Sequence, residues 1–246
     1  MTLNLKILGF WGGFPVSGGA TSSYLITTDQ GRILLDCGSG SMSQLSKFQP
    51  IYDLDAVIIS HLHNDHLADI LTLEHALIVA GRKGLKSNPL PIYSPNLPLA
   101  AYKRINSSYF DRQSIKSNCI LSLKGINVSF LPVHHTVPCF AIKVSQNDKT
   151  IVYTGDTQYF SGLIDFVKEA DLLLCEASIV KGSNHTSGKG HMSGFEAGKL
   201  ARLANVNQLV LTHLPTDGNL KKIEADAKSE FNGRVFLASQ KNEWEI

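Results

Sequence analysis

The strongest constraint on this chain of 246 residues is one stretch in which metal-ligand side chains directly follow an apolar run. Residues 56–66 read Ala-Val-Ile-Ile-Ser-His-Leu-His-Asn-Asp-His, and the four apolar residues are typical of a buried strand. His61 and His63 are two positions apart, so in extended chain their side chains point to the same side. Asp65 and His66 follow at once, where an apolar helical pattern begins. The turn can therefore offer two pairs of ligands.

Neutral imidazole and carboxylate are the usual nitrogen and oxygen ligands of zinc and its neighbours. Burying four such side chains without a metal would leave several polar groups in need of partners. A single histidine such as His75, by contrast, is typical of a surface position or a satisfied core position. The His-x-His-x-Asp-His spacing therefore predicts a metal site.

Other apolar strands are also predicted to end in a ligand-type residue. Binding sites on open sheets commonly collect at strand ends, where loops vary while the sheet stays rigid. The strand-end residues are Asp36, His61, His135 or its neighbour His134, Asp156, Glu176 and His213. We expect them to converge on one site.

The rest of the chain mixes strands and helices without a linker, a repeat or a break in composition, which predicts one α/β domain over residues 1–246. Strands are expected at about 3–7, 24–28, 32–35, 119–123, 126–133, 139–154 (a hairpin), 171–176, 208–212 and 234–238. Helices are expected from the motif to about Ala80, at 163–167, from the Ser193-x-x-Glu196 capping box to about Ala204, and at 220–231.

Three further segments carry no predicted chemistry of their own. Residues 85–118 are expected to hold a short strand and one helix, and 181–190 to form a polar loop. The glycine-rich stretch 9–20 lacks the Gly-Lys-Ser/Thr ending of a P-loop, so we predict a mobile loop between two strands rather than a phosphate cradle. Such a loop could still border the site.

Composition excludes several classes of protein. The formal net charge is only +2 and no run of Lys and Arg occurs, which argues against a broad electrostatic footprint for long nucleic acid. The four cysteines are far apart and include no Cys-x-x-Cys, so they predict reduced core residues rather than disulfides. With no signal-peptide pattern and no apolar run of membrane-spanning length, we expect a cytoplasmic protein without a membrane partner.

The sequence His61-x-His63-x-Asp65-His66 after a hydrophobic strand resembles the signature of the metallo-β-lactamase-fold hydrolases. The resemblance implies the αββα sandwich of that family, in which two mixed sheets lie face to face with helices outside. It also implies a cofactor of two divalent metal ions, zinc in the first place, although manganese and iron accept the same ligands.

The same resemblance implies a role for each residue. The first metal would be bound by His61, His63 and His135, the second by Asp65, His66 and His213, and Asp156 would bridge both. The ribonuclease Z branch has His-Ser/Thr-Val-Pro at the third histidine, and this selects His135 over His134. Asp65 is also implied to orient the attacking water or accept its proton. Asp36 and Glu176 are expected to hold ligand imidazoles by hydrogen bonds, or alternatively to be ordinary polar residues at strand ends.

His191 is not needed as a ligand of either metal. It lies two residues before the capping box, just outside a helix N-terminus, where partial positive charge and free N–H groups favour an anion. Ribonuclease Z-like enzymes have a histidine with a phosphate-contacting or catalytic role in the matching region. We therefore predict that His191 donates to a phosphate oxygen or protonates the departing alkoxide, the alternative being a solvated loop histidine such as His185.

The charge of the implied site points to an anionic substrate. Two divalent ions bring four positive charges, whereas the ligands include only two carboxylates and a bridging hydroxide removes one charge more. The excess positive charge suits a phosphodiester, and two metals can stabilise both the attacking and the leaving oxygen.

The His-Thr-Val-Pro segment resembles ribonuclease Z and its small phosphodiesterase relatives more than glyoxalase II or lactonases. Ribonuclease Z carries a long tRNA-gripping arm between the third histidine and the bridging aspartate. Here Asp156 follows His135 by 21 positions (156 − 135), which leaves room only for a hairpin. We therefore expect a phosphodiesterase for small or cyclic phosphodiesters that takes no long nucleic acid.

Three alternatives stay open: hydrolysis of carboxylic esters, thioesters or lactones on the same metals, RNA cleavage of the ribonuclease Z type, and a metal-stabilised module without catalysis. A homodimer is also left open by the sequence.

Overall fold

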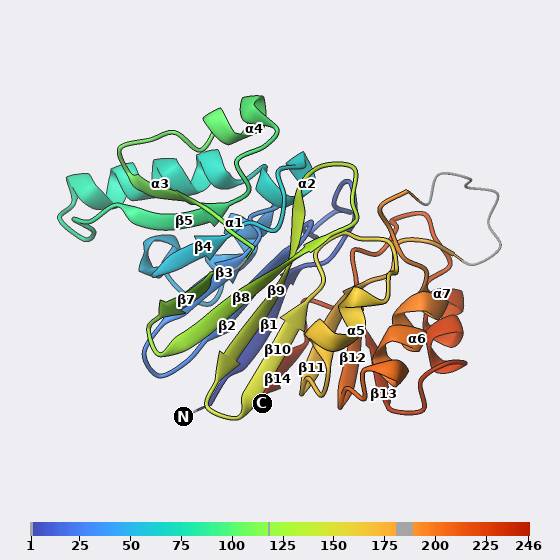
Figure 1. Ribbon diagram of the computed structural model, residues 1–246. Helices are drawn as coiled ribbons and strands as arrows, with labels where there is room; N and C mark the ends of the chain where they lie inside the picture. The colour runs from blue at the N-terminus through green and yellow to red at the C-terminus, as the bar shows by residue number, and fades with distance from the viewer. Residues whose placement is uncertain (1, 118, 181–188) are drawn as a thin grey trace. The chain divides into compact units, whose positions relative to one another are not determined.

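The computed structural model describes residues 2–117, 119–180 and 189–246, and the chain divides into two compact units. The first unit comprises Met1–Ile115 and Gln240–Glu245, and the second comprises Lys116–Ser239 and Ile246. Each unit is built on one mixed sheet of seven strands with helices packed against it (Figure 1). The single domain expected over residues 1–246 stays a prediction.

The sheet of the first unit has the strand order β14-β1-β2-β3-β4-β5-β6. Its strands are β1 (Asn4–Gly9), β2 (Ser23–Thr27), β3 (Arg32–Leu35), β4 (Ala56–Ile58), β5 (Leu90–Ser94), β6 (Phe110–Ser114) and β14 (Glu243–Glu245). Its helices are α1 (Ser41–Leu45), the 3₁₀ helix η1 (Ile51–Asp53), α2 (Asn64–Leu67), α3 (Ile70–Arg82) and α4 (Leu99–Lys103). From β3 to β6 all neighbours are parallel, so the carboxyl ends of β3 and β4 lie at the same edge.

The core of this unit forms because α3 presents one apolar stripe to the sheet. Ile70, Leu73 and Leu77 recur at helical spacing and are buried against strand residues that include Leu34 and Val57. Each fully buried side chain of this size contributes about 1.5–3 kcal/mol relative to an exposed one. This packing fixes the sheet edge from which the histidine motif emerges.

The helix predicted to run from the motif to about Ala80 is interrupted between α2 and α3. The Asp69 N–H donates to the Cys37 carbonyl (3.1 Å), and the Asp69 carboxylate accepts from the Met42 N–H (2.9 Å). The Cys37 N–H in turn donates to the His66 carbonyl (2.8 Å). These long-range bonds replace helical ones and join the metal motif to the turn that follows β3.

The sheet of the second unit has the strand order β13-β12-β11-β10-β9-β8-β7. Its strands are β7 (Ile120–Leu123), β8 (Ile126–Val133), β9 (Cys139–Gln146), β10 (Lys149–Tyr153), β11 (Leu172–Glu176), β12 (Gln208–Thr212) and β13 (Arg234–Leu237), and its helices are α5 (Gly162–Val167), α6 (Gly194–Leu203) and α7 (Leu220–Lys228). From β10 to β13 the strands are parallel, whereas β8 and β10 both run antiparallel to β9. The strands β8, β10, β11 and β12 therefore end at one edge of this sheet.

The predicted capping box of α6 is confirmed. The Ser193 hydroxyl accepts from the Glu196 N–H, and the Glu196 carboxylate accepts from the Ser193 N–H at 2.8 Å. Further along α6, a Cβ on Gly198 would lie 2.3 Å from the Ala227 carbonyl, so glycine is what lets α6 and α7 approach this closely. The cap and the close packing together fix the first turn of α6, directly after His191.

The strands expected from the sequence are present, but β6 and β14 were not predicted. β6 reads Phe-Asp-Arg-Gln-Ser, which has no apolar alternation because the strand lies at the edge of its sheet. β14 has only three residues and exists through its pairing with β1. Residue 118 and most of the expected loop 181–190, including His185, lie outside the described residues.

The cysteines are free, as predicted, and Cys37, Cys139 and Cys175 are buried. Burial raises the pKa of the Cys37 and Cys175 thiols, which keeps these side chains neutral. Within the described residues, no helix combines the length and the apolarity needed to cross a bilayer.

Candidate metal centre

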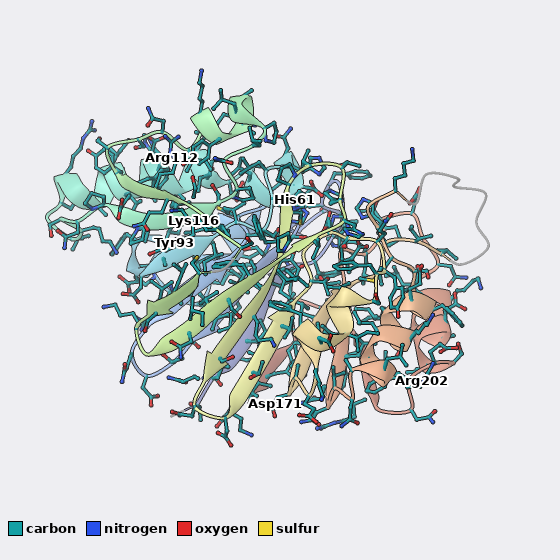
Figure 2. The ribbon with its side chains drawn as sticks, viewed as in Figure 1. His61, Tyr93, Arg112, Lys116, Asp171 and Arg202 are labelled. Carbon is teal, nitrogen blue, oxygen red and sulfur yellow. The ribbon has the colours of Figure 1, made fainter. Side chains whose placement is uncertain are left out.

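In the first unit, the candidate residues follow the carboxyl ends of two neighbouring parallel strands. Asp36 comes directly after β3, and Ser60 and His61 follow β4. All three side chains are buried, and Figure 2 labels His61 at this end of the sheet. Asp36 has a positive φ of 56°, a conformation that turns the chain sharply out of β3.

The Asp36 carboxylate organises this edge through three hydrogen bonds. Its Oδ1 accepts from the Ser60 N–H (2.7 Å), and its Oδ2 accepts from the Ser60 hydroxyl (2.8 Å) and from His66 Nδ1 (2.7 Å). Because a carboxylate only accepts, the His66 proton is on Nδ1 and its Nε2 is left as a ligand atom. Asp36 is therefore hydrogen-bonded to His66, one of the imidazoles predicted as ligands.

Ser60 is a functional residue that the sequence reasoning missed. Its hydroxyl donates its proton to Asp36, so it accepts from His61 Nδ1, which lies 3.1 Å away. The proton of the His61 ring is therefore on Nδ1, and Nε2 is left as the ligand atom. The only signal in the sequence was the position of Ser60 immediately before the histidine motif.

The spacing of the ligand atoms fits metal binding. His61 Nε2 and His63 Nδ1 are 3.1 Å apart, and two nitrogens on one tetrahedral zinc are expected about 3.3 Å apart from bond lengths of about 2.0–2.1 Å. His66 Nε2 and Asp65 Oδ2 lie 3.6 Å apart. Both pairs predicted from the motif therefore have spacings that suit two ligands of one ion.

The glycine-rich loop 9–20 borders this motif. The Gly13 N–H donates to the Asp65 carboxylate at 2.8 Å. Asp65 is also approached through its backbone, because a Cβ on Gly38 would lie 2.3 Å from the Asp65 carbonyl. The loop thus holds one oxygen of the aspartate that the motif predicts as a ligand.

In the second unit, the candidate residues lie at the carboxyl ends of β8, β10, β11 and β12. His135 follows β8, Asp156 follows β10, Glu176 ends β11 and His213 follows β12 with a φ of 52°. His213 Nε2 lies 3.1 Å from Asp156 Oδ2, again the spacing of two ligands on one ion. Asp171, at the start of β11, lies at the opposite end of the same sheet (Figure 2).

His135, and not His134, turns toward this cluster. His135 Nδ1 donates to the Gly190 carbonyl (2.8 Å), which leaves Nε2 as its ligand atom, and one ligand atom each of His135, Asp156 and His191 lie within 4.8 Å of one another. Burial lowers the pKa of His135, which favours the neutral imidazole that binds metals. His134 is exposed and stacks on Phe160, with ring centroids 4.2 Å apart.

Glu176 holds His191 rather than one of the predicted ligands. Its Oε1 accepts from the Thr157 N–H (2.8 Å) and from His191 Nδ1 (3.0 Å), and its Oε2 accepts from the Ser178 hydroxyl (3.1 Å). The His191 ring is half-buried and lies parallel to the His213 ring, with centroids 5.4 Å apart. His191 is therefore part of the cluster and not a solvated loop histidine.

Comparison with known proteins identifies the family. A profile described as "Beta-lactamase superfamily domain" matches residues 31–214. The "Probable metallo-hydrolase YhfI" of Bacillus subtilis (strain 168) is 35% identical over 244 residues, covering 99% of this chain and all of that protein. The crystal structure of YhfI, a metallo-β-lactamase fold protein, superposes with a TM-score of 0.96 at 34% identity and covers both chains completely.

More distant similarities include a ribonuclease Z and a diphosphatase. A ribonuclease Z of Myxococcus xanthus (strain DK1622) is 23% identical over 296 residues, covering 96% of this chain and 95% of that protein. A crystal structure described as a new diphosphatase from the PhnP family superposes with a TM-score of 0.79 at 16% identity, over 99% of this chain and 98% of that one. The chain belongs to the metallo-β-lactamase superfamily, in its ribonuclease Z-like branch.

These findings confirm the predicted fold class and the predicted class of protein. Two mixed seven-stranded sheets with helices are the α/β fold of this family, and the chain is a metallo-hydrolase with histidine and aspartate clusters capable of binding metal. The number and identity of the metal ions and the role of each residue stay predictions.

The close contact between Gly190 and His135 can be tested by substitution. It has a φ of +87°, and a Cβ there would lie 2.5 Å from His135 Nδ1, so Gly190→Ala should push the His135 ring away and weaken metal binding by at least tenfold. Gly84→Ala is the matched control, because Gly84 has a φ of +70° and no atom within 4 Å of the added Cβ. Competitive chelator titration compares the two variants. Equal metal affinity in both would remove the role assigned to the Gly190–His135 contact.

Proposed function

We propose that this protein is a dinuclear metal-dependent phosphodiesterase that acts on small or cyclic phosphodiesters. The observation that carries the proposal is the half-buried His191, held by the carboxylate of Glu176 beside the ligand-type residues His135, Asp156 and His213. A histidine held in this way can protonate the alkoxide that leaves when a phosphodiester is cleaved.

The ligands of the proposed centre are those that the resemblance implies. His61 and His63 with His135 would hold the first ion, Asp65 and His66 with His213 the second, and Asp156 would bridge them. Zinc suits this set of nitrogen and oxygen ligands, and manganese and iron use the same types. When bound, two such ions acidify water and stabilise charge on the attacking and leaving oxygens of a phosphodiester.

The protein side chains supply orientation and proton transfer. The Gly13 N–H holds one oxygen of Asp65, so the other oxygen can orient the attacking water and accept its proton. Glu176 occupies Nδ1 of His191, which leaves Nε2 to donate to a phosphate oxygen or to the departing alkoxide. With two carboxylates among the ligands of two divalent ions, the proposed centre is net positive and favours an anionic substrate.

The relatives support phosphoryl chemistry, and the β9–β10 connection limits the size of the substrate. Both the diphosphatase and the ribonuclease Z named above act on phosphate linkages by their descriptions, which supports phosphoryl chemistry for this chain. Between His135 and Asp156 the chain consists of the β9–β10 hairpin, whose strands are joined across Gln146 and Lys149. A hairpin of this length offers no arm for tRNA, so the expected partner is a small-molecule substrate.

A substrate panel tests the reaction class. The protein reconstituted with zinc or manganese should hydrolyse bis(p-nitrophenyl) phosphate with a kcat/KM at least tenfold above that for matched thioester and lactone substrates. The net positive charge of the proposed centre is the reason for this preference. Faster turnover of thioesters or lactones would make the protein a carboxylic ester hydrolase, and absence of turnover on every substrate would leave a metal-stabilised module.

Metal stoichiometry tests the dinuclear arrangement. Elemental analysis after reconstitution should find close to two ions per chain, and Asp156→Ala should lower this number and abolish activity because the proposed bridge is lost. Asp171→Ala is the control, since it removes the same type of side chain at the opposite end of the same sheet and should leave metal content unchanged. Full activity with one ion per chain would contradict the two-metal proposal.

His191 can be tested separately from metal binding. His191→Ala should retain both metals and lower the phosphodiesterase kcat by roughly 10²–10⁴-fold, the range for a lost acid–base group. His75→Ala, at an exposed position of α3, should change kcat little. Loss of metal in His191→Ala would instead make this residue a ligand or a support of one, and unchanged kcat would exclude a catalytic role.

RNA cleavage of the ribonuclease Z type is the second candidate, because the ribonuclease Z relative matches nearly the whole chain. The short β9–β10 hairpin and the net charge of +2 argue against it. Cleavage of precursor tRNA at its 3′ trailer, measured beside hydrolysis of bis(p-nitrophenyl) phosphate, should be the slower reaction. Efficient trailer removal that exceeds hydrolysis of the small diester would overturn this expectation.

A further inference from the structure

Arg104 of the first unit contacts the histidine motif, residues 61–66. It lies in the segment 85–118, for which the sequence predicted no chemistry. Arg104 directly follows α4, and its Nη1 donates to the side-chain oxygen of Asn64 at 2.7 Å. Asn64 lies between His63 and Asp65 in the sequence, so its Cα is about 3.8 Å from that of each predicted ligand. The hydrogen bond therefore brings a guanidinium group next to the turn that carries four ligand-type side chains.

The segment that carries Arg104 is itself fixed to the sheet. Arg112 on β6, labelled in Figure 2, donates from Nη1 to the Tyr102 carbonyl (2.9 Å), and its guanidinium lies 4.0 Å from the centre of the Tyr102 ring. The Tyr102 hydroxyl is hydrogen-bonded to Ser114 at 3.2 Å. α4 is thus anchored on β6 at Tyr102, two residues before Arg104.

The positive charge of Arg104 is not neutralised by its partner. Asn64 is a neutral amide, and within the described residues no carboxylate forms an ion pair with Arg104. Arg202 on α6 differs, because it pairs with Glu230 at 2.8 Å. Both Arg104 and Asn64 are exposed, so the guanidinium keeps a full charge and meets solvent.

We propose that Arg104 is a specificity-determining residue that binds a phosphate oxygen of the substrate beside the metal centre. The inference rests on the proposed function, because it concerns the anion which that centre would bind. A guanidinium has five N–H donors in a planar fork, and the hydrogen bond to Asn64 occupies only one nitrogen. The Asn64 contact restrains the plane of the group, so the remaining donors are oriented before the substrate arrives.

Arg104 acts on the substrate and not on the metals. Its partner Asn64 is the one polar side chain between His63 and His66 that the motif does not assign as a ligand. Replacing Arg104 should therefore change anion binding while both ions stay bound. A structural tether between α4 and the motif would behave differently, since its loss would disturb the ligand turn and release metal.

Three variants separate these roles by steady-state kinetics. Arg104→Gln should raise the KM for bis(p-nitrophenyl) phosphate by roughly 10- to 100-fold, the range for one lost hydrogen bond to a charged group, with kcat within about twofold. Hydrolysis of the uncharged ester p-nitrophenyl acetate should be unaffected. Arg104→Lys should recover part of the loss, because it restores the charge without the fork.

Lys103→Gln is the matched control, because it removes the same charge from the preceding exposed residue. It should leave the KM within about twofold of the unaltered protein. An equal rise in KM for Lys103→Gln would mean that only the overall field matters, which would overturn the assignment. Metal loss in Arg104→Gln, or an unchanged KM, would overturn it as well.

Binding of inorganic phosphate gives a readout that does not depend on turnover. Calorimetry on the metal-loaded protein should show at least tenfold weaker phosphate binding in Arg104→Gln and no change in Lys103→Gln. If no phosphodiester is hydrolysed but phosphate binding depends on Arg104, the proposed function fails and this inference stands. If diesters are hydrolysed and neither KM nor phosphate affinity depends on Arg104, the inference fails and the proposed function stands.

Discussion

The arrangement of the histidine motif depends on one buried carboxylate, that of Asp36. A buried charge is costly unless it is hydrogen-bonded, and Asp36 meets this condition with donors that include Ser60 and His66. The bond to His66 fixes the tautomer of that ring with its proton on Nδ1. The bond to Ser60 does the same for His61, because the Ser60 hydroxyl can then only accept from His61 Nδ1. Asp36 thus determines that Nε2 is the nitrogen of both His61 and His66 that is left to bind a metal.

The second unit repeats this device with other residues. Glu176 ends a parallel strand, is buried, accepts a backbone N–H from Thr157 and binds His191 through Nδ1. In both units the carboxylate comes from one strand end and the histidine from a different segment. This explains why the two sheets can each present oriented imidazoles although their strand orders and helices differ.

The sequence was informative wherever the interacting residues are close together in the chain. The ligand motif, the capping box of α6 and the hairpins have their partners within a few positions, so spacing alone predicted them. The interruption before α3 was not predictable, because it is caused by Cys37, which lies 32 positions before Asp69. The roles of Ser60, Gly13 and Gly190 were missed for the same reason, since their partners Asp36, Asp65 and His135 are remote in sequence.

Gly190 and His191 are neighbours in the chain but make different contacts. The carbonyl of Gly190 orients His135, the side chain of His191 lies on Glu176, and two residues later Ser193 begins α6. Three structural contacts, those of Gly190, His191 and Ser193, therefore fall within four consecutive residues. Inserting or deleting a single residue between 190 and 193 would break at least one of them, whereas related proteins could vary the length of the polypeptide outside this segment. The stretch from Gly190 to Ser193 therefore sets a register that evolution of new specificities in this fold would have to preserve.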